Sequence, residues 1–258
     1  MIKLDGQIIE QNHFPDGSLF IKKEKVGKHT HYIEWFYEND AELFTLICLK
    51  KSLGYEEAQL ELPYIPHARM DRVKNSEDIF TLKYFCEVIN SLNFSQVWVF
   101  DPHSDVAPAL LDRVYKHRIN YIVEKAIKDI SNPDLMFYFP DAGAAKRYSS
   151  MVKAPYTYGN KNRDWKTGEI RGLSIADPDL VKGKDILIID DICSRGGTFY
   201  YSAKALKEAG ANKIYLYVTH CENTILEGEV LTSGLIEKVY TTNSIFTKEH
   251  EKVEVYEL

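Results

Sequence analysis

Apolar runs that end in loop signals recur along the chain, and segments with a helical period separate several of them. The apolar runs predict strands over residues 44–49, 57–62, 96–100, 135–139, 185–189 and 213–218. The helical periods predict helices over residues 77–92, 105–112, 120–130, 142–151 and 197–209. The segment 39–53 also fits a helix opened by Asn39, so 44–49 has two interpretations. This alternation of strands and helices is typical of an α/β fold with parallel sheets.

The two halves of the chain follow a similar plan. Each contains an apolar strand that leads into a charged loop and then a helix start: VWVFDPHSD near residue 101 and LIIDDICSRGGT near residue 190. The charged stretch 117–133 separates the two series of strands. We therefore expect two tandem domains, 1–125 and 126–258, each with a mainly parallel sheet flanked by helices.

Composition and charge limit which partners and which cellular compartment are expected. The formal net charge of -6 over 258 residues argues against nucleic acid as the main partner, because such partners need many lysines and arginines. No apolar run is long enough to span a membrane, and the N-terminal residues lack the apolar stretch of a secretory signal. The four cysteines follow no metal-binding spacing and suggest no disulfide framework. We expect a cytoplasmic protein without a membrane partner.

The stretch DILIIDDICSRGGT, residues 185–198, combines a predicted strand, two carboxylates and a glycine loop. In an open parallel sheet, ligands bind beyond the carboxyl ends of the strands, where Asp190 and Asp191 are expected. Gly196 and Gly197 open the next helix, whose N-terminal N–H groups can bind a phosphate. The aspartates suit ribose hydroxyls or a hard cation such as Mg²⁺. The alternative is that they cap the helix and that the glycines only form a turn.

This stretch resembles the loop that binds phosphoribosyl diphosphate (PRPP) in the type I phosphoribosyltransferase fold. Four further segments resemble motifs of the ribose-phosphate pyrophosphokinases. LPYIPHARMDR at 62–72 is similar to their ATP-binding PYxxYARQDR, and VFDPHSD at 99–105 to their DLHxxQ. FPDAGAAKR at 139–147 is similar to SPDAGGAKR, and HFPDGS at 13–18 to FxDGE. The matches occur in the order of the family and cover nearly the whole chain.

The resemblance implies two tandem type I phosphoribosyltransferase-like domains, the first binding ATP and the second a ribose phosphate. It implies Mg²⁺-dependent transfer of the β,γ-diphosphate of ATP to the C1 hydroxyl of ribose 5-phosphate, giving PRPP and AMP, by a homo-oligomer such as a dimer or hexamer. The ATP-binding residues would be Phe14, Asp16, Arg69, Asp71 and His103. The ribose-phosphate-binding residues would be Asp190, Asp191, Ser194, Arg195, Gly196, Gly197 and Thr198. The residues that bind Mg²⁺ would be His103 and Asp141.

The stretch YGNKNRDWKTGE, residues 158–169, is rich in turn formers and charge, so we interpret it as a mobile loop. In the family, a K-x-R pair on such a loop closes over the transferred diphosphate. Lys161 and Arg163 fit that spacing and, with His103, are the catalytic candidates. The alternative is a solvated basic loop. We interpret Lys146 and Arg147, in the predicted helix 142–151, as ordinary helix-face charges.

The chain departs from the family pattern at the ligand-binding motifs. Ser18 replaces the acid of FxDGE, and Met70 replaces the amide of ARQDR. Ser194 and Arg195 replace an acid and a threonine in the PRPP loop. Because an arginine suits a longer anion, a 5-substituted ribose such as ADP-ribose is an alternative acceptor, which would give ADP-ribose pyrophosphate and a role in NAD metabolism. Further alternatives are a phosphoribosyltransferase that uses PRPP and a non-catalytic regulatory homologue.

Overall fold

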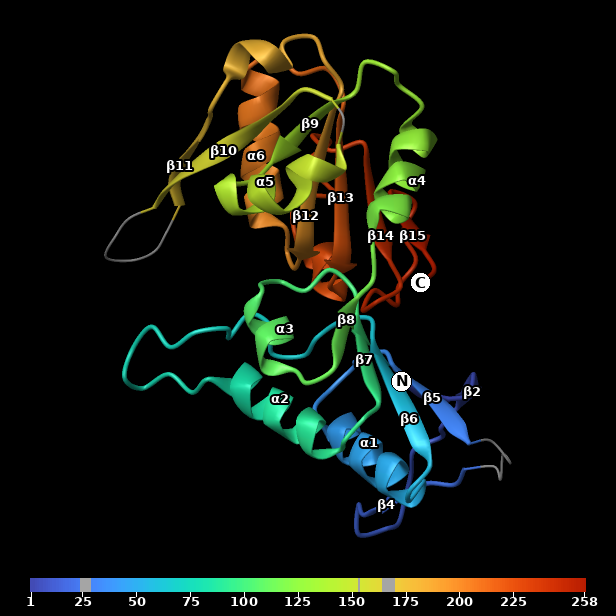
Figure 1. Cartoon of the computed structure of the whole chain (residues 1–258). Helices are drawn as coiled ribbons and strands as arrows, with labels where there is room; N and C mark the ends of the chain where they lie inside the picture. Colours follow the sequence, from blue (N-terminus) through green and yellow to red (C-terminus); the bar gives the residue numbers. More distant parts are fainter. Residues whose placement is uncertain (24–28, 153, 164–169) are drawn as a thin grey trace. The chain divides into compact units, whose positions relative to one another are not determined.

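The computed structural model describes residues 1–23, 29–152, 154–163 and 170–258. The chain divides into two compact units, Met1–Arg118 and Ile119–Leu258 (Figure 1). Each unit is built around its own sheet with its own hydrophobic core. The expected α/β fold with two tandem domains is confirmed.

Helix α4 (Asn120–Ile130) belongs to the second unit. The Lys125 Nζ lies 4.3 Å from the centroid of the Tyr256 ring, and the Tyr256 hydroxyl donates a hydrogen bond of 2.6 Å to Asp129. These contacts tie α4 to the last strand of the chain. A domain boundary after residue 125 would cut this helix, so the boundary lies before it, after Arg118.

The first unit contains a six-stranded sheet in the order β2-β1-β5-β6-β7-β8, whose last four strands are parallel. Its strands are β1 (Ile2–Leu4), β2 (Gln7–Ile8), β5 (Thr30–Trp35), β6 (Glu57–Leu62), β7 (Gln96–Val99) and β8 (Val114–Lys116). Its helices are α1 (Ala41–Ser52), α2 (Thr81–Ser91) and α3 (Val106–Leu110). A separate ribbon pairs β3 (Asn12–His13) with β4 (Leu19–Phe20). Apolar side chains of α1, α2 and the strands form one core.

The segment 44–49, predicted first as a strand, lies inside α1. Leu46 and Leu49, three residues apart, are buried in the core, whereas Phe44 is largely exposed. That spacing is helical, and Asn39 Oδ1 accepts a hydrogen bond of 3.0 Å from the N–H of Ala41 at the helix start. The strand prediction was wrong, and the helical interpretation of 39–53 is confirmed.

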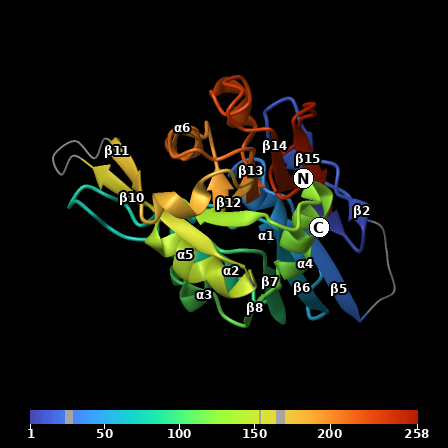
Figure 2. The same ribbon diagram turned by 90° about the horizontal axis from the view of Figure 1, so that it is seen from above.

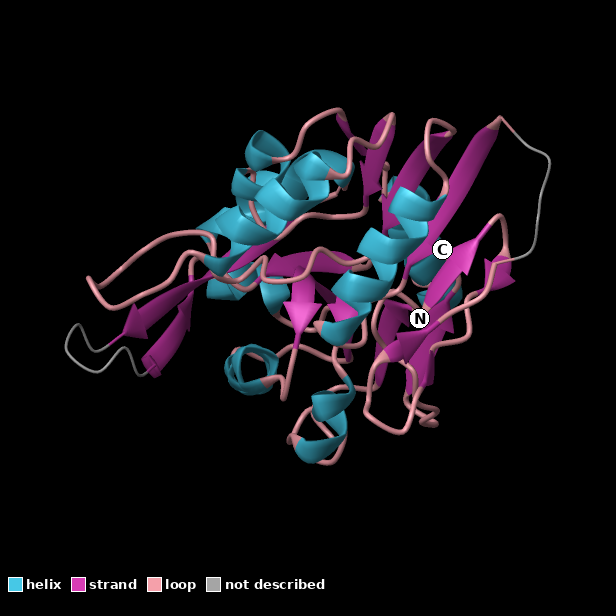
Figure 3. Cartoon of the chain, turned by 90° about the horizontal axis from the view of Figure 1, so that it is seen from below, coloured by secondary structure: helices cyan, strands magenta, loops and turns pink. Residues whose placement is uncertain are grey.

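The second unit contains a seven-stranded sheet in the order β11-β10-β9-β12-β13-β14-β15, parallel except for the edge pair β10–β11. Its strands are β9 (Met136–Phe139), β10 (Tyr156–Arg163), β11 (Ile170–Ile175), β12 (Ile186–Cys193), β13 (Ile214–Cys221), β14 (Lys238–Thr242) and β15 (Val253–Tyr256). Besides α4, its elements are α5 (Ala142–Tyr148), α6 (Gly197–Glu208) and the 3-10 turns Ser149–Met151, Pro178–Val181 and Asn223–Glu227. Figure 3 draws the strands of the chain in magenta and the helices in cyan.

Two features of this sheet differ from the sequence prediction. Strand β12 continues through both aspartates because its parallel pairing with β13 extends to Cys193 and Cys221. The segment predicted as a mobile loop begins instead as β10, which pairs with β11 from Gly159 to Arg163. This β-hairpin extends away from the rest of its sheet (Figures 1 and 2). For residues 158–163 the loop prediction was wrong, because pairing with β11 orders a strand whose own composition favours turns; residues 164–169 lie outside the described residues.

Candidate active site

The two aspartates of the second unit lie where β12 has passed the end of β9. The last residue of β12 that pairs with β9 is Ile188, opposite Tyr138. Beyond it, Asp190 and Asp191 have side chains that are 14% and 2% exposed. Both carboxylates are therefore held inside the protein at the carboxyl end of the sheet, the position at which open α/β sheets bind ligands.

Arg147 of α5 joins these carboxylates. Its Nη2 donates to Asp190 Oδ1 at 3.1 Å and to Asp191 Oδ1 at 2.7 Å. Burial raises the pKa of Asp190 well above its usual range, and the charge of Asp191 raises it further, while Arg147 opposes both effects. The interpretation of Arg147 as an ordinary helix-face charge was therefore wrong. The role of Arg147 follows from the position of α5 directly after β9, the neighbour of β12, and that neighbourhood is seen only in the structure.

The glycine loop makes the turn from β12 into α6. Gly196 has φ +78°, and a β-carbon on it would lie 2.2 Å from Val230 Cγ2. Both the backbone conformation and the packing therefore require glycine here. A β-carbon on Gly197 would meet nothing within 4 Å. The N–H groups of Gly197 and Thr198 belong to the first turn of a twelve-residue helix, where N–H groups have no partner within the helix.

Arg195 lies on the outer side of this loop. Its Nη2 donates to Glu227 Oε2 at 2.9 Å, and the two side chains are 73% and 57% exposed. The backbone passes close to Gly228, because a β-carbon there would lie 1.9 Å from the Arg195 carbonyl oxygen. The guanidinium predicted to bind a longer anion thus already has a carboxylate partner.

Asp141 follows β9 and caps α5. Its Oδ1 accepts a hydrogen bond of 3.0 Å from the N–H of Ala144. The hairpin strand β10 passes close to the same end of β9: a β-carbon on Gly159 would lie 2.3 Å from the Tyr138 hydroxyl oxygen and 2.8 Å from the Pro140 carbonyl oxygen. Only glycine allows this approach.

The backbones of Lys161 and Arg163 lie in β10, and Lys161 pairs with Leu173 of β11. The side chains of both residues lie outside the part of the structure that is described, as do residues 164–169. Strand β10 starts beside β9, so the structure brings the backbone of the predicted K-x-R pair onto the sheet that carries Asp190 and Asp191.

In the first unit, the loops after β6 and β7 bring Asp71 and His103 together. The Asp71 side chain is 4% exposed and accepts from Arg72 Nε at 2.7 Å and Nη2 at 3.1 Å. The hydrogen bond from Arg72 lowers the pKa of Asp71, and Ser104 and His103 add to this effect against burial. Arg69 belongs to the same loop as Asp71. Part of the predicted ATP site is therefore contiguous.

The segment HFPDGS forms the turn of the β3–β4 ribbon. Phe14 and Ser18 are joined through their backbones, and Gly17 has φ +83°. Asp16 Oδ1 accepts from the Ser18 N–H at 2.9 Å and hydroxyl at 2.6 Å, and these hydrogen bonds lower the pKa of Asp16. The Phe14 ring is 52% exposed and contacts Phe20. Ser18, a departure from the family motif, thus orients Asp16.

The predicted Mg²⁺ ligands belong to different units, His103 to the first and Asp141 to the second. Within the described part of the chain, no three His, Cys, Asp or Glu side chains gather in a geometry that could hold a metal ion. An ion would therefore need water or substrate oxygens besides the protein. That coordination is typical of Mg²⁺, which also prefers carboxylate oxygen over imidazole nitrogen.

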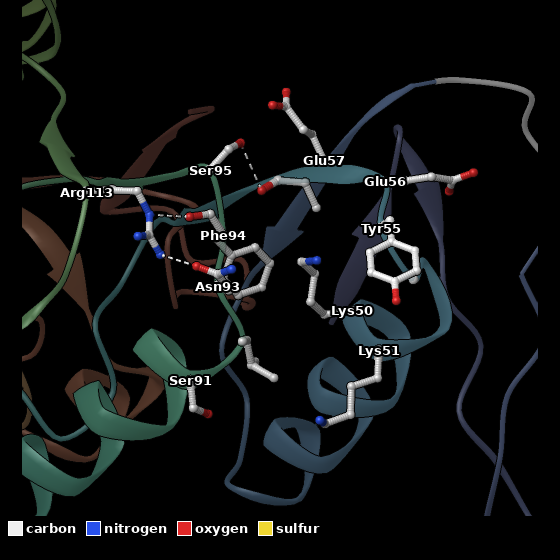
Figure 4. Close-up of a pocket in the computed structure, with 13 residues that line it drawn as sticks. Lys50, Lys51, Tyr55, Glu56, Glu57, Ser91, Asn93, Phe94, Ser95 and Arg113 are labelled. Carbon is white, nitrogen blue, oxygen red and sulfur yellow. Dashed lines mark hydrogen bonds between the residues drawn. The ribbon is translucent and has the colours of Figure 1, made fainter.

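A cavity of about 540 Å³ lies elsewhere in the first unit (Figure 4). It is lined by residues at the amino ends of β6 and β7 and at the C-terminal ends of α1 and α2. Lys50 projects into it, with Nζ 6.0 Å from the centroid of the Phe94 ring, and burial lowers the pKa of Lys50. This is the opposite end of the strands from the loops with Asp71 and His103. The cavity contains none of the predicted site residues.

Comparison with known proteins agrees with this geometry. A phosphoribosyl transferase domain matches residues 143–246. A ribose-phosphate pyrophosphokinase of Pyrococcus abyssi is 29% identical over 251 residues, which cover 93% of this chain and 85% of that protein. One from Listeria ivanovii is 29% identical over 263 residues, covering 95% of this chain and 80% of that protein. The chain is thus similar to ribose-phosphate pyrophosphokinases over nearly its whole length.

The solved structure of phosphoribosylpyrophosphate synthetase from Mycobacterium smegmatis shares the fold. It superposes with a TM-score of 0.77 at 18% identity, over 97% of this chain and 86% of that one. The ribose-phosphate pyrophosphokinases to which the chain is similar are transferases. Among the helices that the structure describes, none has the length and apolar character needed to cross a lipid bilayer.

Proposed function

We propose that this enzyme transfers the β,γ-diphosphate of ATP to the C1 hydroxyl of ribose 5-phosphate, which yields PRPP and AMP. The observation that supports this most is the combination, in the second unit, of two buried carboxylates with a glycine loop that opens α6. Carboxylates accept hydrogen bonds from ribose hydroxyls, and a helix N-terminus stabilises a phosphate dianion. The pyrophosphokinase relatives carry the same substrate class in their names.

In the proposed complex, the loop from Ser194 to Thr198 binds the 5-phosphate. The backbone N–H groups of Gly197 and Thr198 and the two hydroxyls at the ends of the loop are the donors. Asp190 and Asp191 accept hydrogen bonds from the ribose hydroxyls, which orients the C1 hydroxyl. The loop has the shape for this role because Gly196 takes the left-handed conformation that starts α6.

ATP binds in this proposal to the motifs of the first unit. Arg69 pairs with the phosphates, since a guanidinium presents several donors to phosphate oxygens. His103, held near Asp71, orients the same phosphates. The exposed Phe14 ring stacks on the adenine, and the oriented Asp16 carboxylate accepts from its amino group.

Diphosphate transfer needs positioning and charge neutralisation more than covalent chemistry. The C1 oxygen attacks the β-phosphorus, the bond from that phosphorus to the AMP oxygen breaks, and the hydroxyl proton is released. Lys161 and Arg163 stabilise the charge on the diphosphate as it moves. The Asp141 carboxylate is the protein ligand that best suits Mg²⁺, whose charge, when it is bound, neutralises part of the diphosphate. No protein nucleophile is required.

Ribose 5-phosphate is the acceptor that the loop supports best. A 5-substituted ribose such as ADP-ribose would use Arg195 for its second phosphate, but that phosphate would compete with Glu227 for the guanidinium. A phosphoribosyltransferase that uses PRPP, or a non-catalytic homologue, would not require the Asp71 and His103 loops of the first unit together with the K-x-R pair.

Mass spectrometry of the products tests the proposal. The enzyme is incubated with ATP, Mg²⁺ and either ribose 5-phosphate or ADP-ribose. We expect AMP and PRPP, with ribose 5-phosphate used faster. ADP with a monophosphorylated sugar would contradict the reaction class, and faster turnover of ADP-ribose would contradict the acceptor. No product with either acceptor would favour the regulatory alternative.

A further inference from the structure

We propose that Arg147 is a positioning residue for the acceptor: it holds Asp190 and Asp191 in the orientation in which they receive the ribose hydroxyls. The assignment rests on the proposed function of the carboxylate pair. Arg147 lies in α5, outside both the glycine loop and the K-x-R pair. Arg147 acts in this role through the two carboxylates.

Arg147 contacts the Oδ1 atom of each carboxylate. A single nitrogen, Nη2, donates to Oδ1 of both Asp190 and Asp191. Asp190 Oδ1 also accepts from the backbone N–H of Asp191 at 3.0 Å, so this oxygen has two donors. With their Oδ1 atoms held in this way, the rotation of both carboxylate groups is restricted. Charge-assisted hydrogen bonds of this kind are the strongest that side chains make.

The sheet explains how one side chain reaches two neighbours on a strand. Successive residues of a strand project to opposite faces, so a common partner is unusual. Here β9 ends at Phe139, while β12 continues to Cys193. The edge of β12 beyond Ile188 is therefore not paired with β9, and the chain that leaves β9 returns as α5. Arg147 approaches the carboxylates from that helix.

The positive charge of Arg147 has a second effect on the two carboxylates. Two neighbouring carboxylates that are 14% and 2% exposed repel each other, and burial disfavours their ionised forms. Hydroxyl groups donate best to ionised carboxylates. The guanidinium, 30% exposed, supplies the opposite charge before the acceptor arrives. We therefore expect its loss to weaken acceptor binding and to leave ATP binding unchanged.

The test compares Arg147→Met, which removes the charge, with Arg147→Lys, which keeps the charge but loses the planar fork. Lys146→Met, at the exposed preceding position of α5, is the matched control. Each variant of the full chain is titrated calorimetrically with ribose 5-phosphate alone and with Mg-ATP alone. Steady-state KM values for both substrates and circular dichroism spectra accompany the titrations.

We expect Arg147→Met to weaken ribose 5-phosphate binding about ten- to a hundredfold, the range for a lost charge-assisted contact, with an unchanged dissociation constant for ATP. Arg147→Lys should recover part of the loss, and Lys146→Met should match the parent. A folded Arg147→Met variant with parental affinity for ribose 5-phosphate would overturn the assignment. So would an equal loss for both substrates, which would indicate a general structural role.

Two further outcomes are also decisive. If Arg147→Met does not fold, Arg147→Lys decides, because its charge is kept: weaker acceptor binding with parental ATP binding supports the assignment, and parental binding of both overturns it. If the parent protein itself neither binds nor turns over ribose 5-phosphate, the proposed function fails, and the role of Arg147 fails with it. A parent that is active, with variants that do not discriminate between the substrates, refutes the role of Arg147 alone.

Discussion

Each unit places a buried carboxylate beside an arginine, but the two pairs are built differently. In the first unit, Arg72 directly follows Asp71 and is 68% exposed, so one loop makes the whole pair. In the second, Arg147 on α5 joins carboxylates on β12 that lie 43 and 44 residues further along the chain. The first pair can form wherever its loop is intact. The second exists only when β9, α5 and β12 are assembled.

This difference has consequences for binding. A substrate phosphate can attract an exposed arginine away from its carboxylate at little cost, because water already solvates the guanidinium. A partly buried arginine shared by two carboxylates is held by the fold, and its removal costs more stability than the removal of an exposed one. We therefore expect the first unit to adapt when ATP binds, and the carboxylate pair of the second unit to be formed in advance.

The largest expected effect is on protein stability, which should fall far more when Arg147 is replaced than when Arg72 is replaced. Arg147→Met leaves two buried carboxylates without their cation and should lower the free energy of unfolding by roughly 3 kcal/mol. Arg72→Met should change it little, because the Arg72 side chain is exposed. Urea unfolding followed by circular dichroism measures both. Equal losses in the two variants would show that the pairs do not differ as described.

The next effect distinguishes residues of the second unit that act in the transition state from residues of the first unit that bind ATP. Lys161→Ala and Arg163→Ala should each lower kcat about a hundredfold, because their contacts form chiefly in the transition state, and should leave the Kd of ATP unchanged. Arg69→Ala, in the first unit, should instead weaken ATP binding. Single-turnover rates and equilibrium titration with ATP provide the two measurements. Parental turnover in both hairpin variants would show that the K-x-R assignment is wrong.

A smaller effect is expected at two glycines in the left-handed region, one in each unit, where replacement by alanine can be compared directly. Gly17 and Gly196 have φ +83° and +78°, so alanine is strained at both positions. Only at Gly196 would the new β-carbon also meet Val230, at 2.2 Å. We expect Gly196→Ala to destabilise by about 1–2 kcal/mol more than Gly17→Ala. The midpoints of urea unfolding test this, and equal shifts would mean that Val230 moves aside without cost.

The smallest effect concerns the acceptor. Because Arg195 is exposed and paired with Glu227, Arg195→Thr should change kcat/KM for ribose 5-phosphate and ADP-ribose together, by about twofold or less. Steady-state kinetics with each acceptor give the ratio. A loss for ADP-ribose that is tenfold larger than for ribose 5-phosphate would revive the alternative in which the loop binds a longer anion.

The sequence predicts well those features that arise from neighbouring residues. An apolar strand followed by carboxylates and glycines over residues 185–198 is local, and the structure shows β12, the turn at Gly196 and α6 there. The predicted strands 57–62, 96–100 and 213–218 also correspond to β6, β7 and β13. Each combines a run of apolar residues with loop signals at its end, so no distant contact is needed to recognise it.

Features that depend on distant contacts were missed. The role of Arg147 requires knowing that β9 and β12 are neighbours, which a single sequence does not reveal. Strand β10 contains glycine, asparagine and charged residues and is ordered by its pairing with β9 and β11. In the segment 44–49, a continuous apolar run concealed the helical spacing of Leu46 and Leu49. Tertiary context decided each of these cases.

The close approach at Gly159 also constrains how this protein can evolve. The Tyr138 hydroxyl occupies the space that a side chain at 159 would need, and the Pro140 carbonyl closes it from another direction. Replacing Tyr138 with phenylalanine would remove only the first obstacle. Every residue at 140 carries that carbonyl, so among descendants of this sequence glycine at 159 should persist for as long as β10 follows this path. The identity of residue 159 is therefore fixed by the path of the backbone that joins the hairpin to the strand preceding Asp141.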